Sequence, residues 1–241
     1  MIALHTMAPV GWGLLAPSPF CLKAELCLRM AGRQYTLRPT LTADRAPRGK
    51  LPWAEDGAVV VEDSQRLVEH LQAAHGDPLG DLALSAAQRG RAHLARRVAE
   101  TSLYFALVDE RWRDPEVRAA YAGDLLAALP ALARPLVRAY ATRALLQQGR
   151  AQGTSRRPRE EVTAEGAADL DALAVALGDD PWFTGDRPTS VDAAVFGQLA
   201  NLWYVPVHTP LRRALAARPS LVAFLERVRT RWVSDVPVRL P

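Results

Sequence analysis

The stretch that decides the fold is residues 18–32, SPFCLKAELCLRMAG. Serine followed by proline is a strong helix start, because the serine hydroxyl caps a free backbone amide and proline suits the first helical position. Apolar residues at helical spacing give this stretch one apolar face: Phe20, Ala24, Cys27 and Ala31. Gly32 supplies a stop signal. The stretch therefore predicts an amphipathic helix that begins at Ser18.

Short strand patterns surround this helix. Residues 2–7 (IALHTM) and 34–38 are strand candidates, and the turn Glu-Asp-Gly at 55–57 lies between two further strand candidates, which indicates a hairpin. A second helical pattern follows, SQRLVEHLQAAHG. The order strand, helix, strand, hairpin, helix predicts a compact α/β domain with a small mixed sheet over residues 1–78.

The rest of the chain, residues 84–241, carries only helical patterns. Segments rich in Ala, Leu and Arg predict helices at residues 86–112, 115–128, 130–148, 160–178, 190–203 and 211–232. The polar, glycine-bearing segment 147–159 predicts a loop. Thr189 and Asp192 match a capping box, in which the acid reaches back to a backbone amide. We therefore predict an all-α second domain.

Composition excludes several classes of protein. The 241 residues are 49% hydrophobic and 23% charged, which is typical of a globular protein. No apolar run reaches the roughly 18 residues of a membrane span, and no basic segment precedes an apolar one at the N-terminus. We expect a soluble, cytoplasmic protein without a membrane partner. The net charge of +4 comes from scattered arginines, which favours a solvated surface over a nucleic-acid partner.

Cysteine and histidine spacing predicts neither a disulfide nor a metal site. Cys21 and Cys27 lie six helical positions apart, about 240° around a helix axis, so they are poorly placed to bridge. The histidines show no H-E-x-x-H or comparable ligand spacing: His5, His70, His75, His93 and His208. We therefore predict that the chain binds no metal.

Several ordered motifs resemble those of the glutathione transferase superfamily. Residues 18–21 (Ser-Pro-Phe-Cys) stand where glutaredoxins carry Cys-Pro-Tyr-Cys and many transferases carry a serine. Leu51-Pro52 resembles the cis-proline of the superfamily, and Asp63-Ser64 resembles its γ-glutamyl-binding pair. The resemblance implies a thioredoxin-like first domain that binds glutathione as co-substrate through these four residues.

The second half carries the resemblance further. Residues 185–192 (GDRPTSVD) resemble a segment of the transferase helical domain, which implies an all-α glutathione-transferase C-terminal domain. The stretches SPFCLKAELCLRMAG, LYFALVDERW and LGDDPWFTGDRPTSVDAAVFG are similar to the failed axon connections and metaxin-like branch. The resemblance implies a homodimer. It also implies that the first long helix faces the inter-domain cleft, so Tyr104, Arg111 and Trp112 are candidates for an electrophile pocket, although such spacing is also typical of core residues.

The residue types at 18–21 suit thiol chemistry. A helix N-terminus carries partial positive charge and free amides, so it stabilises an anion. Together with a hydroxyl donor it could lower the pKa of a bound thiol from about 8.5 by one or two units. Ser18 is therefore a catalytic candidate, and the alternative is that it only caps the helix. Cys21 is either a second reactive thiol in the same field or a small core residue.

The leading prediction is a glutathione S-transferase-like enzyme that activates a thiol for attack on a small hydrophobic electrophile. A thiol-dependent isomerase or the use of another small thiol stays open. The alternative from another class is a non-catalytic interaction module of metaxin type. A Ser18 side chain that reaches solvent and a cis peptide before Pro52 are expected for the enzyme.

Overall fold

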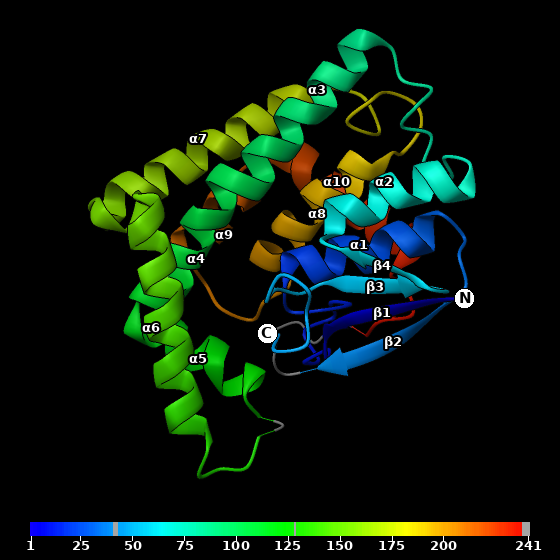
Figure 1. Ribbon diagram of the computed structural model, residues 1–241. Helices are drawn as coiled ribbons and strands as arrows, with labels where there is room; N and C mark the ends of the chain where they lie inside the picture. Colours follow the sequence, from blue (N-terminus) through cyan, green and yellow to red (C-terminus); the bar gives the residue numbers. More distant parts are fainter. Residues whose placement is uncertain (41–42, 128, 238–241) are drawn as a thin grey trace.

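The computed structural model describes residues 1–40, 43–127 and 129–237. The first part of the chain forms the predicted order of elements: β1 (Ile2–Met7), α1 (Pro19–Met30), β2 (Tyr35–Thr40), β3 (Trp53–Asp56), β4 (Val59–Glu62) and α2 (Ser64–His75). The strands pair in the order β2-β1-β3-β4, with β1 parallel to β2 and antiparallel to β3. Helices α1 and α2 lie on one face of this mixed sheet (Figure 1). The prediction of a thioredoxin-like first part is confirmed.

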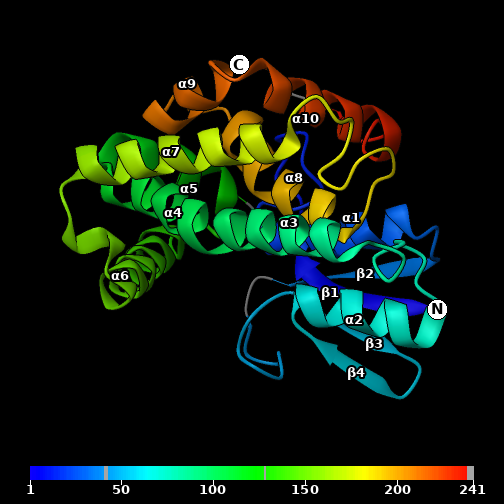
Figure 2. The same ribbon diagram turned by 90° about the horizontal axis from the view of Figure 1, so that it is seen from above.

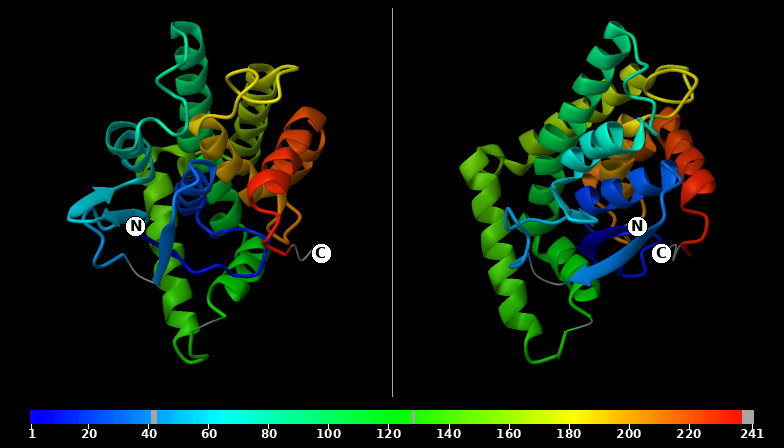
Figure 3. Two further views of the ribbon diagram at one scale, coloured as in Figure 1. Left: turned by 90° about the vertical axis from the view of Figure 1, so that its right-hand side faces the viewer. Right: turned by 45° about the vertical axis from the view of Figure 1, so that its right-hand side comes forward.

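In the second part of the described chain every secondary-structure element is a helix, as predicted. Its elements are α3 (Ala86–Arg97), the π-helix η1 (Val98–Leu103), α4 (Tyr104–Arg113), α5 (Pro115–Leu125), α6 (Arg134–Gln152), the 3₁₀ turn η2 (Thr154–Arg156), α7 (Arg159–Leu177), α8 (Ser190–Trp203), α9 (Pro210–Ala216) and α10 (Pro219–Trp232). Helix α6 lies along the outer edge of this part, next to α4 (Figure 3).

Two helix boundaries differ clearly from the sequence prediction. The predicted helix 211–232 is two helices, because Pro219 disfavours helical backbone at the residue before it, and Arg218 has φ −121° and ψ 83°. The predicted loop 147–159 begins later, since α6 continues to its stop at Gly153, where φ is +114°. The predicted helix end at residue 128 and the chain end 238–241 lie outside the described residues.

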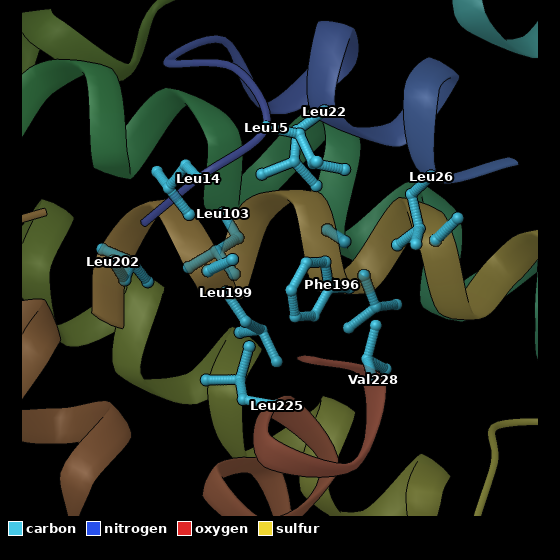
Figure 4. Packing of buried hydrophobic residues seen from close by; sticks show 14 of the residues in the cluster. Leu14, Leu15, Leu22, Leu26, Leu103, Phe196, Leu199, Leu202, Leu225 and Val228 are labelled. Carbon is cyan, nitrogen blue, oxygen red and sulfur yellow. The ribbon is translucent and has the colours of Figure 1, made fainter. Parts of the chain in front are cut away.

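Helix α1 is the centre of the packing, because it lies between the sheet and α8 (Figure 2). Side chains of its inner faces, such as Leu22 and Leu26, are fully buried. Phe196 of α8 lies between these leucines and Val228 of α10 (Figure 4). Burying a leucine or phenylalanine contributes about 2 kcal/mol each. This shared core fixes the position of α1 relative to the helical part.

A glycine sets the distance between α1 and α8. A Cβ atom at Gly197 of α8 would lie 2.5 Å from the carbonyl oxygen of Pro19, the first residue of α1. Only glycine allows the two backbones to approach this closely. The packing of α8 therefore holds the N-terminus of α1 in place. None of the helices in the described ranges is long and apolar enough to cross a bilayer.

Candidate functional site

One end of the sheet brings the predicted site residues together. Trp53 at the start of β3 pairs with His5 near the end of β1 and with Glu62 at the end of β4. Pro52 and Asp63 therefore lie at the edge where β1 ends, and the amide of Asp63 donates a hydrogen bond to the Pro52 carbonyl over 3.2 Å. Helix α1 connects two parallel strands, so it runs back along the sheet and its N-terminus lies at the same edge.

Ser18 is the N-cap of α1. We call this helix start the open start, because its cap makes one long side-chain hydrogen bond and no acid lies in its first turn. Ser18 has an extended backbone (φ −89°, ψ 127°), and its Oγ accepts from the amide of Cys21 over 3.5 Å, which is long for a hydrogen bond. The side chain is half-buried, and the first turn of α1 contains no acidic residue. Pro19 has no amide hydrogen and the Cys21 amide bonds Ser18, so the positive end of the helix dipole is the main feature available to an external anion.

Cys21 lies in the core and not on the site surface. Its side chain is 0% exposed, and burial raises the pKa of its thiol despite hydrogen bonding from the neighbouring Met7 backbone and the Thr6 and Ser18 side chains. A buried, protonated thiol is a poor nucleophile. The placement corrects the catalytic candidacy of Cys21: it packs as a small apolar residue.

The Leu51–Pro52 bond is cis, as the resemblance implies. Leu51 is half-buried and Pro52 is buried against the sheet. The sequence did not show that Asp63 and Ser64 occupy different positions at the start of α2. Asp63 is the N-cap of α2 and accepts from the amide of Gln65 over 2.7 Å, whereas Ser64 is the first helical residue and is buried.

Asp63 has an unusual backbone conformation, with φ +77° and ψ 143°. A non-glycine residue in this region costs on the order of 1–3 kcal/mol and is found mostly where a binding site requires it. The residue is exposed, so its carboxylate can reach a ligand at the same edge. The strained turn therefore supports the prediction that Asp63 faces a bound group.

A buried charged cluster behind the two helix starts was missed by the sequence analysis. Lys23 is only 1% exposed, and its Nζ donates to Glu100 Oε1 over 2.7 Å and to Gln65 Oε1 over 2.9 Å. The three side chains come from α1, η1 and α2. Because they are 42 and 77 positions apart in the chain, no local pattern relates them.

Of the three predicted pocket residues, Tyr104 lies near the start of α1. Its ring packs edge-to-face on Phe20, with the ring centroids 5.0 Å apart. Phe20 is the second residue of α1, so this aromatic pair lies beside the helix start. Burial raises the pKa of the Tyr104 hydroxyl, which stays protonated at neutral pH.

Arg111 and Trp112 lie in the interior. Arg111 donates to Asn201 Oδ1 over 3.1 Å and stacks on the Tyr121 ring at 4.5 Å. Trp112 contacts the same tyrosine, with ring centroids 5.7 Å apart. The void beside Arg111 has a volume of about 10 Å³, which is room for no more than one water. Their burial corrects the pocket assignment of these two residues to a packing role.

Tyr121 and Trp12 are further residues that the sequence analysis did not select. The Tyr121 hydroxyl donates to the Pro17 carbonyl over 3.4 Å, and Trp12 Nε1 donates to Asp124 Oδ2 over 2.7 Å. Both bonds tie α5 to the loop that precedes Ser18. A larger cavity, of about 530 Å³, lies elsewhere and is lined by residues such as Asp77, Thr189 and Trp232, and by none of the predicted site residues.

The prediction of no metal site overlooked one cluster. Asp56, His70 and His75 bring three possible metal-ligating atoms within 4.8 Å of one another. Asp56 ends β3 and His75 ends α2, opposite the ends at Pro52 and Ser64, whereas His70 lies near the middle of α2. Five positions separate the histidines, which is not a spacing that places both side chains on one helix face.

Comparison with family models and known proteins agrees with this geometry. A model described as "Glutathione S-transferase N-terminal domain" matches residues 19–117, and one described as "Glutathione S-transferase, C-terminal domain" matches residues 166–228. The chain is 31% identical over 238 residues to an isoprene-epoxide glutathione S-transferase from Rhodococcus sp. strain AD45, covering 96% of this chain and 99% of that protein.

Two further relatives belong to the branch predicted from the sequence. The chain is 26% identical to Failed axon connections of Drosophila melanogaster, covering 90% of this chain and 55% of that protein. It is 28% identical to a Metaxin-1 homolog of Caenorhabditis briggsae, covering 91% of this chain and 70% of that protein. Among solved structures, rice GST1 in complex with glutathione superposes with a TM-score of 0.62 at 18% identity, covering 98% of this chain and 90% of that chain.

Proposed function

Because the chain belongs to the glutathione S-transferase superfamily, we propose that it is a glutathione transferase that conjugates the tripeptide to a small apolar epoxide. The proposal rests most directly on the open start of α1 at Ser18. This helix start offers a hydroxyl, the positive end of the helix dipole and no competing acid at the edge where the Pro52 turn and α2 also begin.

Binding of the tripeptide would use the two neighbouring helix starts. Asp63 is exposed and acidic, so it can pair with the ammonium of the γ-glutamyl group, and the first amides of α2 can hold the adjacent carboxylate. The backbone beside Pro52 would pair with the peptide backbone. The cysteinyl sulfur would then lie at the start of α1.

The reaction is a nucleophilic ring opening. The thiol proton leaves to solvent, and the Ser18 hydroxyl donates a hydrogen bond to the sulfur anion while its oxygen accepts from Cys21. The thiolate attacks an epoxide carbon, so that a C–S bond forms, the C–O bond breaks and the released alkoxide takes a proton from water. Thiolate stabilisation and proximity supply the acceleration.

The epoxide class comes from two observations. The Rhodococcus relative of nearly equal length is named for isoprene epoxide. The groups beside the helix start are the apolar rings of Phe20 and Tyr104, which suit a small apolar substrate. The protonated Tyr104 hydroxyl could also donate to the developing alkoxide.

A second candidate function is a non-catalytic interaction module. The similarity to Failed axon connections and to a Metaxin-1 homolog favours it. The two functions differ at the helix start, because an interaction module has no need of an accessible hydroxyl and an uncompensated helix dipole at Ser18.

The deciding experiment combines binding and turnover. Isothermal titration with glutathione and product detection with isoprene monoepoxide should give millimolar or tighter binding and a thioether product. Ser18→Ala should lower turnover at neutral pH at least tenfold with little change in glutathione affinity. Absence of binding at about 10 mM glutathione, a concentration above the millimolar Kd of a weak ligand, would reject the glutathione transferase. It would leave the interaction module or an enzyme that uses another small thiol.

The location and assembly proposed for the enzyme are cytoplasmic and homodimeric. A transferase that uses glutathione needs the reduced thiol, which a reducing compartment maintains. Gel filtration with light scattering checks the assembly: a mass near twice the 26.3 kDa of the chain supports the dimer, and a mass equal to one chain contradicts it.

A further inference from the structure

A cluster of two imidazoles and one carboxylate lies where the hairpin β3–β4 meets the C-terminus of α2. His70 Nε2 lies 2.9 Å and His75 Nε2 lies 2.6 Å from the same oxygen of Asp56, Oδ2. The side chains are 15%, 22% and 19% exposed, respectively, so the group is partly buried and open on one side. From this convergence we propose that Asp56, His70 and His75 form a binding site for a divalent transition-metal ion, Zn²⁺ above all.

The convergence has a specific structural origin. His70 and His75 are about 140° apart around an α-helix axis, so the helix alone would not aim them at one point. Asp56, the last residue of β3, projects between the two rings, which meet edge-to-face with centroids 5.6 Å apart. Three ligands from two elements are therefore gathered by the tertiary fold.

The site is held in place on both sides. Asp56 is fixed by its strand partners Ile2 and Val59. His75 is the last residue of α2, and Arg33 donates to its backbone carbonyl over 2.9 Å. Two ordered elements therefore carry the ligands, which limits the rearrangement that an ion would require.

The donor set selects the class of ion. Two imidazoles with one carboxylate suit Zn²⁺ and its first-row neighbours, whereas Mg²⁺ and Ca²⁺ prefer oxygen ligands alone. The C-terminus of a helix carries partial negative charge, which favours a cation beside His75.

Ion binding would replace the present hydrogen bonds. Ligand atoms about 2.05 Å from a tetrahedral Zn²⁺ lie about 3.3 Å apart. Relative to Asp56 Oδ2, the His70 nitrogen must therefore move by about 0.4 Å and the His75 nitrogen by about 0.7 Å. With three protein ligands, the fourth position would be taken by water. The bound ion would tie the hairpin to the end of α2.

The site is separate from the proposed glutathione site. The twelve residues of α2 place its two ends about 16 Å apart. Ser64 is at one end and His75 at the other, so loss of the ion should leave glutathione turnover within about twofold. Zn²⁺ binding at this cluster therefore does not depend on the proposed transferase activity, and either property can be present without the other.

The test uses the full chain without a polyhistidine tag. Zn²⁺ is titrated calorimetrically, with Mg²⁺ as the comparison ion. His70→Gln and His75→Gln remove an imidazole ligand but keep a hydrogen-bond donor for Asp56, and His93→Gln on α3 is the matched control at an exposed histidine. We expect one Zn²⁺ per chain, at least tenfold weaker binding in each cluster variant, and unchanged binding in the control.

A second measurement on the wild-type chain does not depend on how the variants fold. Crystals soaked in Zn²⁺ should show an anomalous-scattering peak beside Asp56 Oδ2. Equal affinity of the cluster variants and the wild type, equal affinity for Mg²⁺, or a peak only at other histidines would overturn the proposal.

Discussion

The helices α1 and α8 begin with similar capping residues, but the polar groups around the two helix starts differ. Each follows an extended Ser or Thr cap, Ser18 and Thr189, and each lies near the contact between the two parts of the molecule. At α8 the Asp192 carboxylate accepts from the amides of Thr189 over 2.7 Å and of Phe183 over 3.0 Å. At α1 the cap contributes one long hydrogen bond, and no acid is present in the first turn.

The difference explains why we propose a binding site at one helix start and not at the other. The start of α8 is buried, and the carboxyl group of Asp192 accepts from amides at and just before it, so this helix start stabilises the fold. The start of α1 lacks such an acid and is half-exposed, so the positive end of its dipole remains for a ligand. A second acid, Asp81, accepts from Ser190 Oγ over 2.8 Å, so a further polar group here has a partner within the protein. We call the start of α8 the closed start. Changes at each start should therefore affect stability and activity very differently.

The largest expected effect is on stability, at the closed start. Asp192→Ala leaves two buried amides without an acceptor, which costs about 1–3 kcal/mol for each. We expect the free energy of unfolding to fall by about 4 kcal/mol in urea denaturation monitored by circular dichroism. A loss below about 1 kcal/mol would show that the two amides find other acceptors.

The closed start should also give the stability a pH dependence. Burial raises the pKa of Asp192 to about 7, whereas in the unfolded chain it is about 3.9. Between these values the folded state holds a proton that the unfolded state has released, so this group's contribution to stability decreases as pH rises. We expect a loss of about 2 kcal/mol between pH 5 and 7.

Asp192→Asn is the control for this pH dependence, because it cannot ionise. Its stability should change less than that of the wild type over the same range. Carboxylates whose pKa is lowered, such as Asp56 and Asp235, titrate below pH 5 and so do not contribute to the change between pH 5 and 7. Parallel curves for the two proteins would contradict the buried, proton-binding carboxyl.

An intermediate effect is expected where the two helices touch. Gly197→Ala places a Cβ atom 2.5 Å from the Pro19 carbonyl, so α8 must move away from the start of α1. Overpacking of this kind costs about 1–3 kcal/mol, measurable as a lower Tm. Gly123→Ala, at an exposed helical position with open space around it, is the matched control and should leave Tm unchanged or slightly raised.

The smallest effect on stability is expected at the open start. A serine cap commonly contributes about 1 kcal/mol, but the Ser18 hydrogen bond is long, so Ser18→Ala should cost about 0.5 kcal/mol. Urea denaturation compares this loss with that of Asp192→Ala. A loss above about 2 kcal/mol would mean that Ser18 closes its helix as firmly as the capping box closes α8.

Features that depend on neighbouring residues could be predicted from the sequence, whereas contacts between distant residues could not. The helix from Ser18, the hairpin at 55–57 and the Thr189–Asp192 box were predictable because each depends on residues within a few positions. The helix break at Arg218 could have been found from the proline that follows it.

Other features depend on tertiary packing and have no local pattern. The Lys23–Glu100 pair and the Asp56–His70–His75 cluster join elements that meet only in the folded chain. The pocket assignment failed for Arg111 and Trp112 because helical spacing shows that residues share a face but not whether that face is covered. Here Tyr121 of α5 covers it.

The most direct test of the account measures the ionisation of bound glutathione at the open helix start. Thiolate absorbance near 240 nm is titrated against pH for the glutathione complexes of the wild type and Ser18→Ala. We predict that the wild type lowers the thiol pKa by about one to two units from its free value of about 8.5, and that the variant loses most of this shift. A bound thiol that titrates at the same pH in both proteins would contradict the central role of Ser18.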